Sequence, residues 1–260
     1  MAEPTIGILT RLKHLRIDRF RSQQTYRPPG RVIEEKDRWR DRATHGPKLQ
    51  KDLIAAFTAA HAALAGRTPD QVDGKAGVYL EVEAAKGVPL PDLDWPSKDI
   101  RLGAAREMDG VQSGTLFVPE SAEAFLTEKV RQYAFENTPS QKPSHFARFD
   151  PLETIRAATV ESLWTDQRPI PADPAATIWW ECWCWRDRAG HLVPAANRLN
   201  LRVSERRLHF PEFDVIPVYG TRTDIARLHR YTDAIEELRL GHVGKVQSHR
   251  RIAAMVIMAR

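Results

Sequence analysis

The sequence predicts an α+β fold, with helices on one face of a mostly antiparallel sheet. Two observations lead to this class. Residues 77–84 (GVYLEVEA) alternate apolar and polar side chains, the period of a half-buried strand, and Asp109-Gly110 joins two extended runs as tight hairpin turns do. Segments with helical spacing then follow the hairpin instead of alternating with single strands, which favours a layer of helices on a sheet. A ferredoxin-like antiparallel sheet with an additional helical layer is the simplest arrangement that fits.

Helical spacing appears both before the first strand and after the hairpin. In residues 48–64 (KLQKDLIAAFTAAHAAL) apolar side chains recur at intervals of three and four, and Gly66 supplies a stop. The run that Ser121 caps, SAEAFLTEKVRQYAFE, repeats this spacing. His61 is expected to be a solvated or packing residue of the first helix, and His45 a residue at its start.

The second half of the chain is predicted to mix helices and strands. Helices are expected at 152–166, 194–201 and 223–241, and strands at 178–185 and 214–220, with a short extended piece (RRLHF) between. These elements complete the sheet and supply the additional helical layer.

The chain divides into three parts on composition. Residues 1–42 form a basic extended arm, 43–240 the α+β domain, and 241–260 a basic apolar tail with four basic and no acidic side chains. Within the domain, the core is expected at about 77–186 and an extension of helix, strand and helix at 187–240.

The basic arm carries a charge equal to the whole formal net charge of the protein. It holds eleven Lys/Arg against six Asp/Glu, a surplus of +5, and its Pro28-Pro29-Gly30 forbids a continuous helix. Such an arm can meet nucleic acid, an acidic protein surface or only water. The candidate partner-binding residues in it are arginines: Arg16, Arg19, Arg21, Arg27 and Arg31.

Composition also bears on the compartment. No run of about 18 apolar residues occurs, and the first thirty residues lack a long apolar stretch followed by a small-residue cleavage site. The two cysteines, Cys182 and Cys184, lie too close in sequence for an ordinary disulfide. A cytoplasmic, reduced protein without a membrane partner is the expectation.

Residues 177–186 (TIWWECWCWR) concentrate four tryptophans and both cysteines. Three explanations compete: a thiolate metal site, an aromatic platform for stacking bases, and a sheet core. A metal site needs about four donors, and a stacking platform needs interleaved Lys/Arg, of which only Arg186 is near. Core packing in a central strand is therefore favoured, with Trp179, Trp183 and Trp185 as a partner-facing patch on one face.

No local catalytic motif occurs in the sequence. Gly-x-Ser-x-Gly, a Walker loop, His-Glu-x-x-His and Gly-x-Gly-x-x-Gly are all missing. We therefore expect no catalytic, cofactor-binding or metal-binding residue in this chain. An enzyme whose site is assembled from scattered residues would leave no such signature and stays an alternative.

Several strings, in order, resemble a known family. HLRIDRFRS, ATHGPKL, GVYLEVEA, TLFVPE, SLWTD, IWWECW and IEELRLG are similar to the region that precedes the catalytic domain in a group of large bacterial subtilisin-like (S8) serine peptidases. The resemblance covers about residues 14–241 and rests on the order and spacing of the strings. The tail does not resemble the family's continuation.

The resemblance implies a function and partners. In that group the region precedes an Asp/His/Ser catalytic domain, and the protein is commonly encoded beside an AAA-type ATPase, which implies a paired system in bacterial defence. No triad residue is present here, so none can be carried over. Subtilisin propeptides are also small ferredoxin-like domains, which dock on the protease through their sheet. Four functions stay open: a regulatory domain that binds a subtilisin-like catalytic domain, an adaptor for the ATPase, a nucleic-acid-binding module using the arm, and the enzyme named above.

Overall fold

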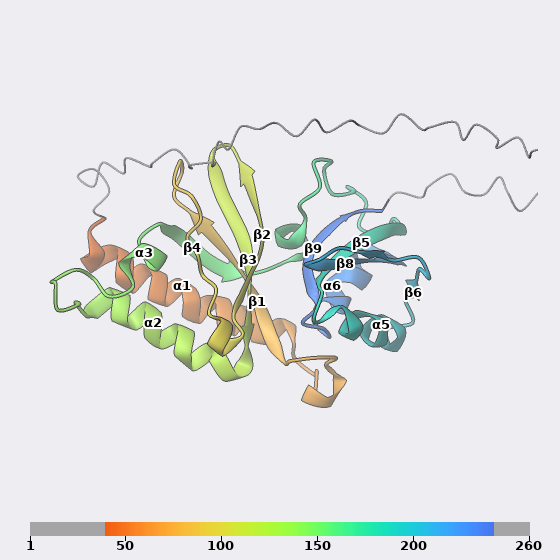
Figure 1. The fold of residues 1–260 in the computed structure, drawn as a ribbon, viewed down its shortest axis with the longest axis horizontal. Helices are drawn as coiled ribbons and strands as arrows, with labels where there is room; N and C mark the ends of the chain where they lie inside the picture. Colours follow the sequence, from red (N-terminus) through yellow and green to blue (C-terminus); the bar gives the residue numbers. More distant parts are fainter. Residues whose placement is uncertain (1–39, 242–260) are drawn as a thin grey trace, which may run out of the picture. The chain divides into compact units, whose positions relative to one another are not determined.

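The computed structural model describes residues 40–241 (Figure 1). The predicted arm lies outside these residues except for its last three positions, as do the tail beyond Gly241 and all five candidate arginines of the arm. Across the described range the fold is α+β with two antiparallel sheets, which confirms the predicted class. No helix within 40–241 is long and apolar enough to cross a membrane.

Helices and strands are interspersed along the described chain. The helices are α1 (Arg42–Ala63), α2 (Glu123–Phe135), α3 (Phe146–Phe149), α4 (Val160–Leu163), α5 (Ala189–Arg198) and α6 (Arg222–Leu228), with short 3-10 turns η2 (Pro69–Gln71), η3 (Pro96–Lys98) and η4 (Glu120–Ala122). The strands are β1 (Gly77–Ala84), β2 (Arg101–Met108), β3 (Val111–Pro119), β4 (Leu152–Ala157), β5 (Ile178–Trp185), β6 (Arg202–Val203), β7 (Leu208–His209), β8 (Phe213–Gly220) and β9 (Ile235–Leu240).

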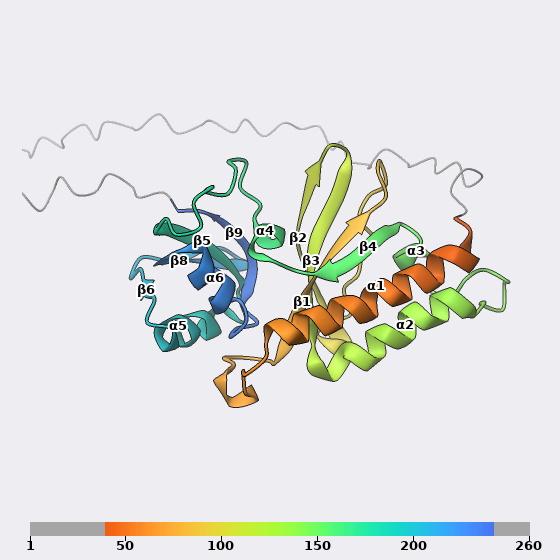
Figure 2. The same cartoon turned by 180° about the vertical axis from the view of Figure 1, so that it is seen from behind.

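The first sheet has the strand order expected of a ferredoxin-like fold. Its order is β2-β3-β1-β4, every neighbouring pair is antiparallel, and the predicted hairpin turns at Asp109 and Gly110, both with positive φ. The crossover from β1 to β2 holds only η3, where a ferredoxin-like fold has a helix. Helix α1, which precedes β1 in the chain, instead lies beside α2 on the same face of the sheet (Figures 1 and 2).

Helix α1 buries an apolar stripe against α2 and the first sheet. Leu49 and Leu53 are fully buried, as their helical spacing predicted. A side chain at Gly46 would place its Cβ 2.6 Å from the Cα of Ala134, so the glycine lets the two helices approach closely. His61 is exposed near Glu123, as expected of a solvated residue.

His45 is more than the helix-start residue that the sequence predicted. It lies in the first turn of α1 but is buried, with Nδ1 2.8 Å from the Tyr133 hydroxyl and Nε2 2.8 Å from the Leu152 carbonyl. Its segment showed none of the apolar residues expected around a buried histidine, because α2 and β4 supply them from elsewhere in the chain. Burial lowers the pKa of His45, so the neutral ring fits this site.

Two predicted helices are wrong in the same way. Residues 152–166 form strand β4 followed by the single turn α4, and residues 223–241 form α6 followed by strand β9. Each segment has a helical spacing of apolar side chains, but pairing with a distant strand decides the outcome: β4 pairs with β1, and β9 with β5. The predicted helix at 194–201 lies within the range of α5 for most of its length.

A second sheet stands where the additional helical layer was predicted. Its order is β6-β8-β5-β9, with β7 paired to β8, and α5 and α6 cover its inner face. The tryptophan strand β5 is central in this sheet, as predicted, but it does not belong to the ferredoxin-like core that was expected at 77–186. That core comprises β1 to β4 alone.

Strand β1 is buried on both of its faces. Val78, Leu80 and Val82 pack under α1 and α2 in one apolar cluster, whereas Tyr79 joins Phe117 in a second cluster with the inner face of the second sheet. The sequence predicted a half-buried strand because Glu81 alternates with apolar residues. The second half of the fold covers this polar face, so even Glu81 is only 5% exposed.

Candidate functional site

The three tryptophans predicted as a partner-facing patch separate in the structure. Trp179 and Trp183 are half-buried on the outer face of the second sheet, the face away from α5 and α6. Trp185 is 9% exposed and lies against Phe117 of β3, with ring centroids 6.5 Å apart. The prediction is therefore wrong for Trp185, because the end of β5 runs against the first sheet and is covered there.

Each of the two remaining tryptophans carries an arginine over its ring. Arg202 of β6 lies 5.3 Å from the Trp179 ring centroid, and Arg239 of β9 lies 4.2 Å from that of Trp183. Strand pairing places them there, because β6 pairs with β8 and β9 pairs with β5. The sequence showed only Arg186 near the tryptophans, since both arginines come from strands distant in the chain.

Further aromatic rings complete this surface. Tyr219 lies 5.2 Å from Trp179, Phe210 stacks on Trp183 at 5.6 Å with an interplanar angle of 10°, and Phe213 meets the same ring edge-on. We call Trp179, Trp183, Arg202, Tyr219 and Arg239 the arginine–tryptophan face. It presents flat rings and guanidinium groups on a paired, rigid sheet.

Neither cysteine is available for metal or nucleophilic chemistry. Cys182 and Cys184 are fully buried on the inner face of β5, and burial raises the pKa of the Cys182 thiol to about 12. A thiol with that pKa stays protonated near neutral pH. No group of three or more possible metal ligands gathers within residues 40–241.

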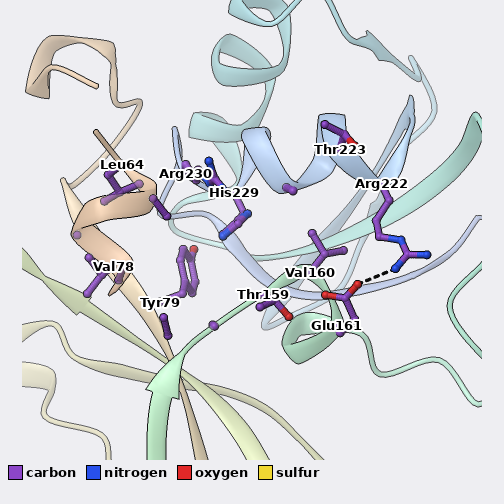
Figure 3. A pocket seen from close by; sticks show the side chains of 16 residues that line it. Leu64, Val78, Tyr79, Thr159, Val160, Glu161, Arg222, Thr223, His229 and Arg230 are labelled. Atoms are coloured by element: carbon purple, nitrogen blue, oxygen red, sulfur yellow. Dashed lines mark hydrogen bonds and ion pairs between the residues drawn. The ribbon is translucent and has the colours of Figure 1, made fainter. Parts of the chain in front are cut away.

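A cavity of about 310 Å³ lies where the two sheets and their helices meet (Figure 3). Its walls come from the end of α1, the start of β1, the segment between β4 and α4, and helix α6. Small apolar side chains line much of it: Ala60, Ala63, Leu64, Val78, Ala157, Ala158, Val160 and Ala226. This volume is at the lower end of the range typical of small-molecule sites, about 300 to 1,000 Å³.

Two buried polar groups belong to side chains that line this cavity. No partner of the Tyr79 hydroxyl or of His229 Nδ1 meets full hydrogen-bond geometry among the described residues, although the Ile235 N–H interacts with the Tyr79 hydroxyl and the Ile225 and Ala226 carbonyls interact with the His229 ring. Tyr79 is 6% exposed and His229 9% exposed, and their rings meet edge-on with centroids 6.0 Å apart. Figure 3 shows Tyr79 rising from β1 toward His229, which follows the last turn of α6.

The protonation of these two groups follows from their burial. Burial and the charge of Asp233 raise the pKa of Tyr79 well above its usual value, although Arg188 and the Ile235 N–H oppose the rise. Burial and the charge of Arg230 lower the pKa of His229 to about 4. Near neutral pH the Tyr79 phenol and the His229 imidazole are therefore both neutral.

The arginines around the cavity differ in their pairing. Arg222 binds Glu161 at 2.8 Å and donates to the Pro171 and Ala172 carbonyls. The side chain of Arg230 has no ion pair or hydrogen bond to any residue from 40 to 241, and its Nε atom is buried. One cation at the cavity is thus uncompensated.

A second polar cluster joins the two halves, and its Lys75, Arg188 and His191 line a separate open pocket of about 610 Å³. Asp233, which is 1% exposed, accepts from His191 at 2.6 Å and from the Lys75 N–H at 3.0 Å, and pairs with Arg188 at 3.3 Å. Gly74 has a φ of 101°, and a Cβ there would lie 2.0 Å from the Asp233 carboxylate. Asp233 is thus held from three sides, and Arg188 also forms an ion pair with Asp99, which indicates a structural role for the cluster between the segment before β9, α5 and the segment before β1.

Comparisons with protein-family models, with curated proteins and with solved structures found no match to this chain. The resemblance to the subtilisin-like peptidases therefore stays a prediction. Sequence reasoning missed Tyr79 and His229 as site residues. Tyr79 carried a weak signal, a large aromatic ring on the polar face of an alternating strand, whereas His229 lay in a segment predicted as one continuous helix and carried none.

Proposed function

We propose that this chain is a non-catalytic docking domain that binds a subtilisin-like catalytic domain through the arginine–tryptophan face. The class of partner comes from the sequence resemblance, and the contact surface comes from the geometry of the second sheet. The observation that carries the proposal is the placement of Arg202 over Trp179 and of Arg239 over Trp183 on the outer face, where both rings are half-buried and Arg239 also pairs with Glu237.

Subtilisin propeptides dock through the open face of their sheet, but the corresponding face of the first sheet is covered in this fold. The face of that sheet opposite α1 and α2 carries Glu81, Thr115 and Phe117, all at most 5% exposed, because α4 and the second half of the fold cover them. A partner protein must therefore use another face. The outer face of the second sheet carries aromatic side chains that are partly exposed among the described residues.

The composition of this face suits a protein interface. Tryptophan, tyrosine and arginine are the residue types that most often dominate binding energy at interfaces, since large rigid rings bury much area at little entropic cost. The adjoining segment at 203–207 (VSERR) adds two further exposed arginines, Arg206 and Arg207, against Glu205. The face thus fits an acidic surface on the partner, which also agrees with the partner expected for the basic arm.

The test compares two arginines with the same local chemistry. Arg202 lies over Trp179 on the proposed face, and Arg148 lies 4.3 Å from the ring of Trp95 on the first half of the fold. We expect the full-length chain to bind the subtilisin-like catalytic domain of its own host, and Arg202→Glu to weaken binding at least about tenfold, while Arg148→Glu leaves it unchanged. Calorimetric titration of the purified proteins gives both values.

Two results would refute this function. The first is the absence of binding to any subtilisin-like catalytic domain of the host, with nucleic acid or an AAA-type ATPase as the ligand recovered instead. The second is an equal loss for Arg202→Glu and Arg148→Glu, which would show that the charge of the whole chain, and not this face, determines binding.

A further inference from the structure

We infer that the open pocket of about 610 Å³ beside the Asp233 cluster binds a small phosphorylated polyol, such as a sugar phosphate, with Lys98 holding the phosphate and Asp187 and His191 the hydroxyl groups. None of the lining residues belongs to the arginine–tryptophan face, so this inference goes beyond the docking function. It rests on exposed polar side chains of one pocket that keep free hydrogen-bonding positions.

The first step concerns the polarity of the wall. Nine of the eleven lining residues are charged or polar, and only Pro96 and Ala122 are apolar. The wall comes from both halves of the fold: η3, the start of β2 and η4 on one side, and the residues that lead into α5 on the other. Such a wall offers little apolar surface for a ligand to cover, so the ligand must be hydrophilic.

The second step concerns charge. Four lysine and arginine side chains line the pocket, against two carboxylates on the wall and one buried behind it, which leaves one positive charge over. The carboxylates are those of Asp99, Asp187 and Asp233. Three of the cations form ion pairs with them: Lys75, Arg101 and Arg188.

The fourth cation, Lys98, supplies the place for an anion. It is exposed and forms no ion pair with any residue from 40 to 241, and its Nζ atom lies 5.4 Å from the centroid of the Phe125 ring. The hydroxyl groups of Ser97 and Ser121 line the same pocket and make no hydrogen bond within these residues. An ammonium group and two hydroxyl donors suit a phosphate group, whose oxygens accept several hydrogen bonds.

The third step concerns hydrogen-bond acceptors. His191 Nδ1 lies 2.6 Å from the Asp233 carboxylate, so this nitrogen carries the proton, and Nε2 of the neutral ring is an acceptor. The side chain of His191 is 38% exposed and that of Asp187 is 60% exposed. Asp187 accepts from Arg101 through both oxygens, at 2.6 and 2.7 Å, and each oxygen keeps a second lone pair. A ligand that carries hydroxyl groups as well as an anionic group can donate to both residues.

The fourth step concerns the size and shape of the ligand. A volume of about 610 Å³ lies within the range of small-molecule sites, about 300 to 1,000 Å³. Among the described residues no aromatic ring except the His191 imidazole lines the pocket, so a nucleobase has no platform on which to stack. A sugar phosphate therefore fits the lining better than a nucleotide does.

The experiment titrates the full-length chain calorimetrically with ribose 5-phosphate, ribose, inorganic phosphate and AMP. We expect saturable binding of ribose 5-phosphate, weaker binding of inorganic phosphate, no measurable binding of ribose, and no gain in affinity from the base of AMP. Lys98→Gln should weaken the binding of ribose 5-phosphate about tenfold, since it removes a hydrogen bond between charged groups. Lys129→Gln is the matched control and should leave affinity unchanged, because Lys129 also lies over the Phe125 ring, at 5.2 Å, but does not line the pocket.

Four results would overturn the inference. They are a lack of saturation by ribose 5-phosphate at millimolar concentration, inorganic phosphate binding as tightly as ribose 5-phosphate, an equal effect of Lys98→Gln and Lys129→Gln, and tighter binding of AMP or of a single-stranded oligonucleotide. Should a variant fail to fold, NMR spectra of the wild-type chain decide: bound ribose 5-phosphate must shift the ring signals of His191, and unmoved signals contradict the site. None of these measurements depends on a protease partner, so the two proposals fail separately.

Discussion

Two buried tyrosines in this protein have opposite environments. The Tyr133 hydroxyl meets the His45 ring at 2.8 Å and Asp150 at 3.3 Å, so its polar atom is satisfied inside the core. The Tyr79 hydroxyl is just as deeply buried, but its O–H finds no acceptor within residues 40–241. The hydroxyl of Tyr133 thus contributes to stability, whereas that of Tyr79 is buried without an acceptor among the described residues and costs free energy of folding.

This contrast predicts opposite effects of the same substitution. Tyr79→Phe should raise the free energy of unfolding by about 1 kcal/mol, because it removes an unsatisfied buried donor and keeps the ring. Tyr133→Phe should lower that free energy by about 1 to 2 kcal/mol, because His45 and Asp150 lose a partner. Urea denaturation of the two variants measures both changes. Destabilisation by Tyr79→Phe equal to that of Tyr133→Phe would show that Tyr79 has a partner in solution.

At the scale of elements, a single carboxylate ties four of them together. Glu81 of β1 accepts from Arg106 of β2, from Arg156 of β4 and from Ser162 of α4, at distances of 2.6 to 3.0 Å. The strand order β2-β3-β1-β4 places β1 where side chains from both outer strands can reach it. This network lies on the sheet face that the second half of the fold covers.

Removal of the charge at Glu81 should destabilise the packing of the two halves at this covered sheet face. Burial alone would raise the pKa of Glu81, but the hydrogen bonds of Arg156 and Ser162 and the arginine charges together hold it below its usual value. Stability from this group is therefore present above the unfolded pKa and lost as pH falls through the folded one. Glu81→Gln should cost about 2 to 3 kcal/mol at pH 7 and little in strong acid. Thermal unfolding at several pH values checks this, with Glu83→Gln as the more exposed control; a pH-independent loss would contradict it.

Local patterns predicted the elements that are determined locally. The helical spacing of α1, the Asp109-Gly110 turn and the alternation in β5 each act within a few residues, and each appears in the structure. The segments 152–166 and 223–241 failed because β4 and β9 depend on partners far along the chain. In the structure, capping boxes at Thr159 and Thr221 stand at the starts of α4 and α6, a local signal that the predictions for these two segments did not use.

The candidate sites were harder to predict than the elements, for the same reason. Trp179 and Trp183 could be placed on one strand face from alternation alone, but their arginines come from β6 and β9. The cavity needs Tyr79 of β1 beside His229 after α6, two residues that only the packing of the two halves brings together. The spacing of residues within one segment does not predict a contact between two segments that are far apart in the sequence.

At the scale of the whole molecule, the pKa values of the buried His229 and the partly buried Glu236 are shifted in opposite directions. Burial and the charge of Arg230 lower the pKa of His229 from 6.5 to about 4. Burial and the charges of Glu237, Glu212 and Asp94 raise the pKa of Glu236 from 4.5 to about 7, with Arg101 opposing. The first group resists taking up a proton on acidification, and the second resists losing one on alkalinisation.

The signs of the two contributions follow from proton linkage. Between about pH 4 and 6.5 the unfolded chain protonates the histidine and the folded chain does not, so His229 makes stability rise with pH. Between about pH 4.5 and 7 the unfolded chain ionises Glu236 and the folded chain does not, so Glu236 makes stability fall with pH. The contribution of His229 is about 3 kcal/mol, and that of Glu236 is smaller because it is partly exposed.

Over these overlapping pH ranges the two contributions oppose each other. We therefore expect these two groups to give the free energy of unfolding only a weak dependence on pH in the wild type and a stronger one in each single variant. In His229→Gln the contribution of Glu236 is no longer opposed by that of His229, so from about pH 5 to 7 the free energy of unfolding should rise less, or fall more, with pH than in the wild type. In Glu236→Gln the free energy of unfolding should rise more steeply with pH than in the wild type over the same range. Urea denaturation of the three proteins at matched ionic strength gives the slopes. Two variants with parallel profiles would show that these groups titrate alike in the folded and unfolded chain, and that the halves of the fold admit water at their junction.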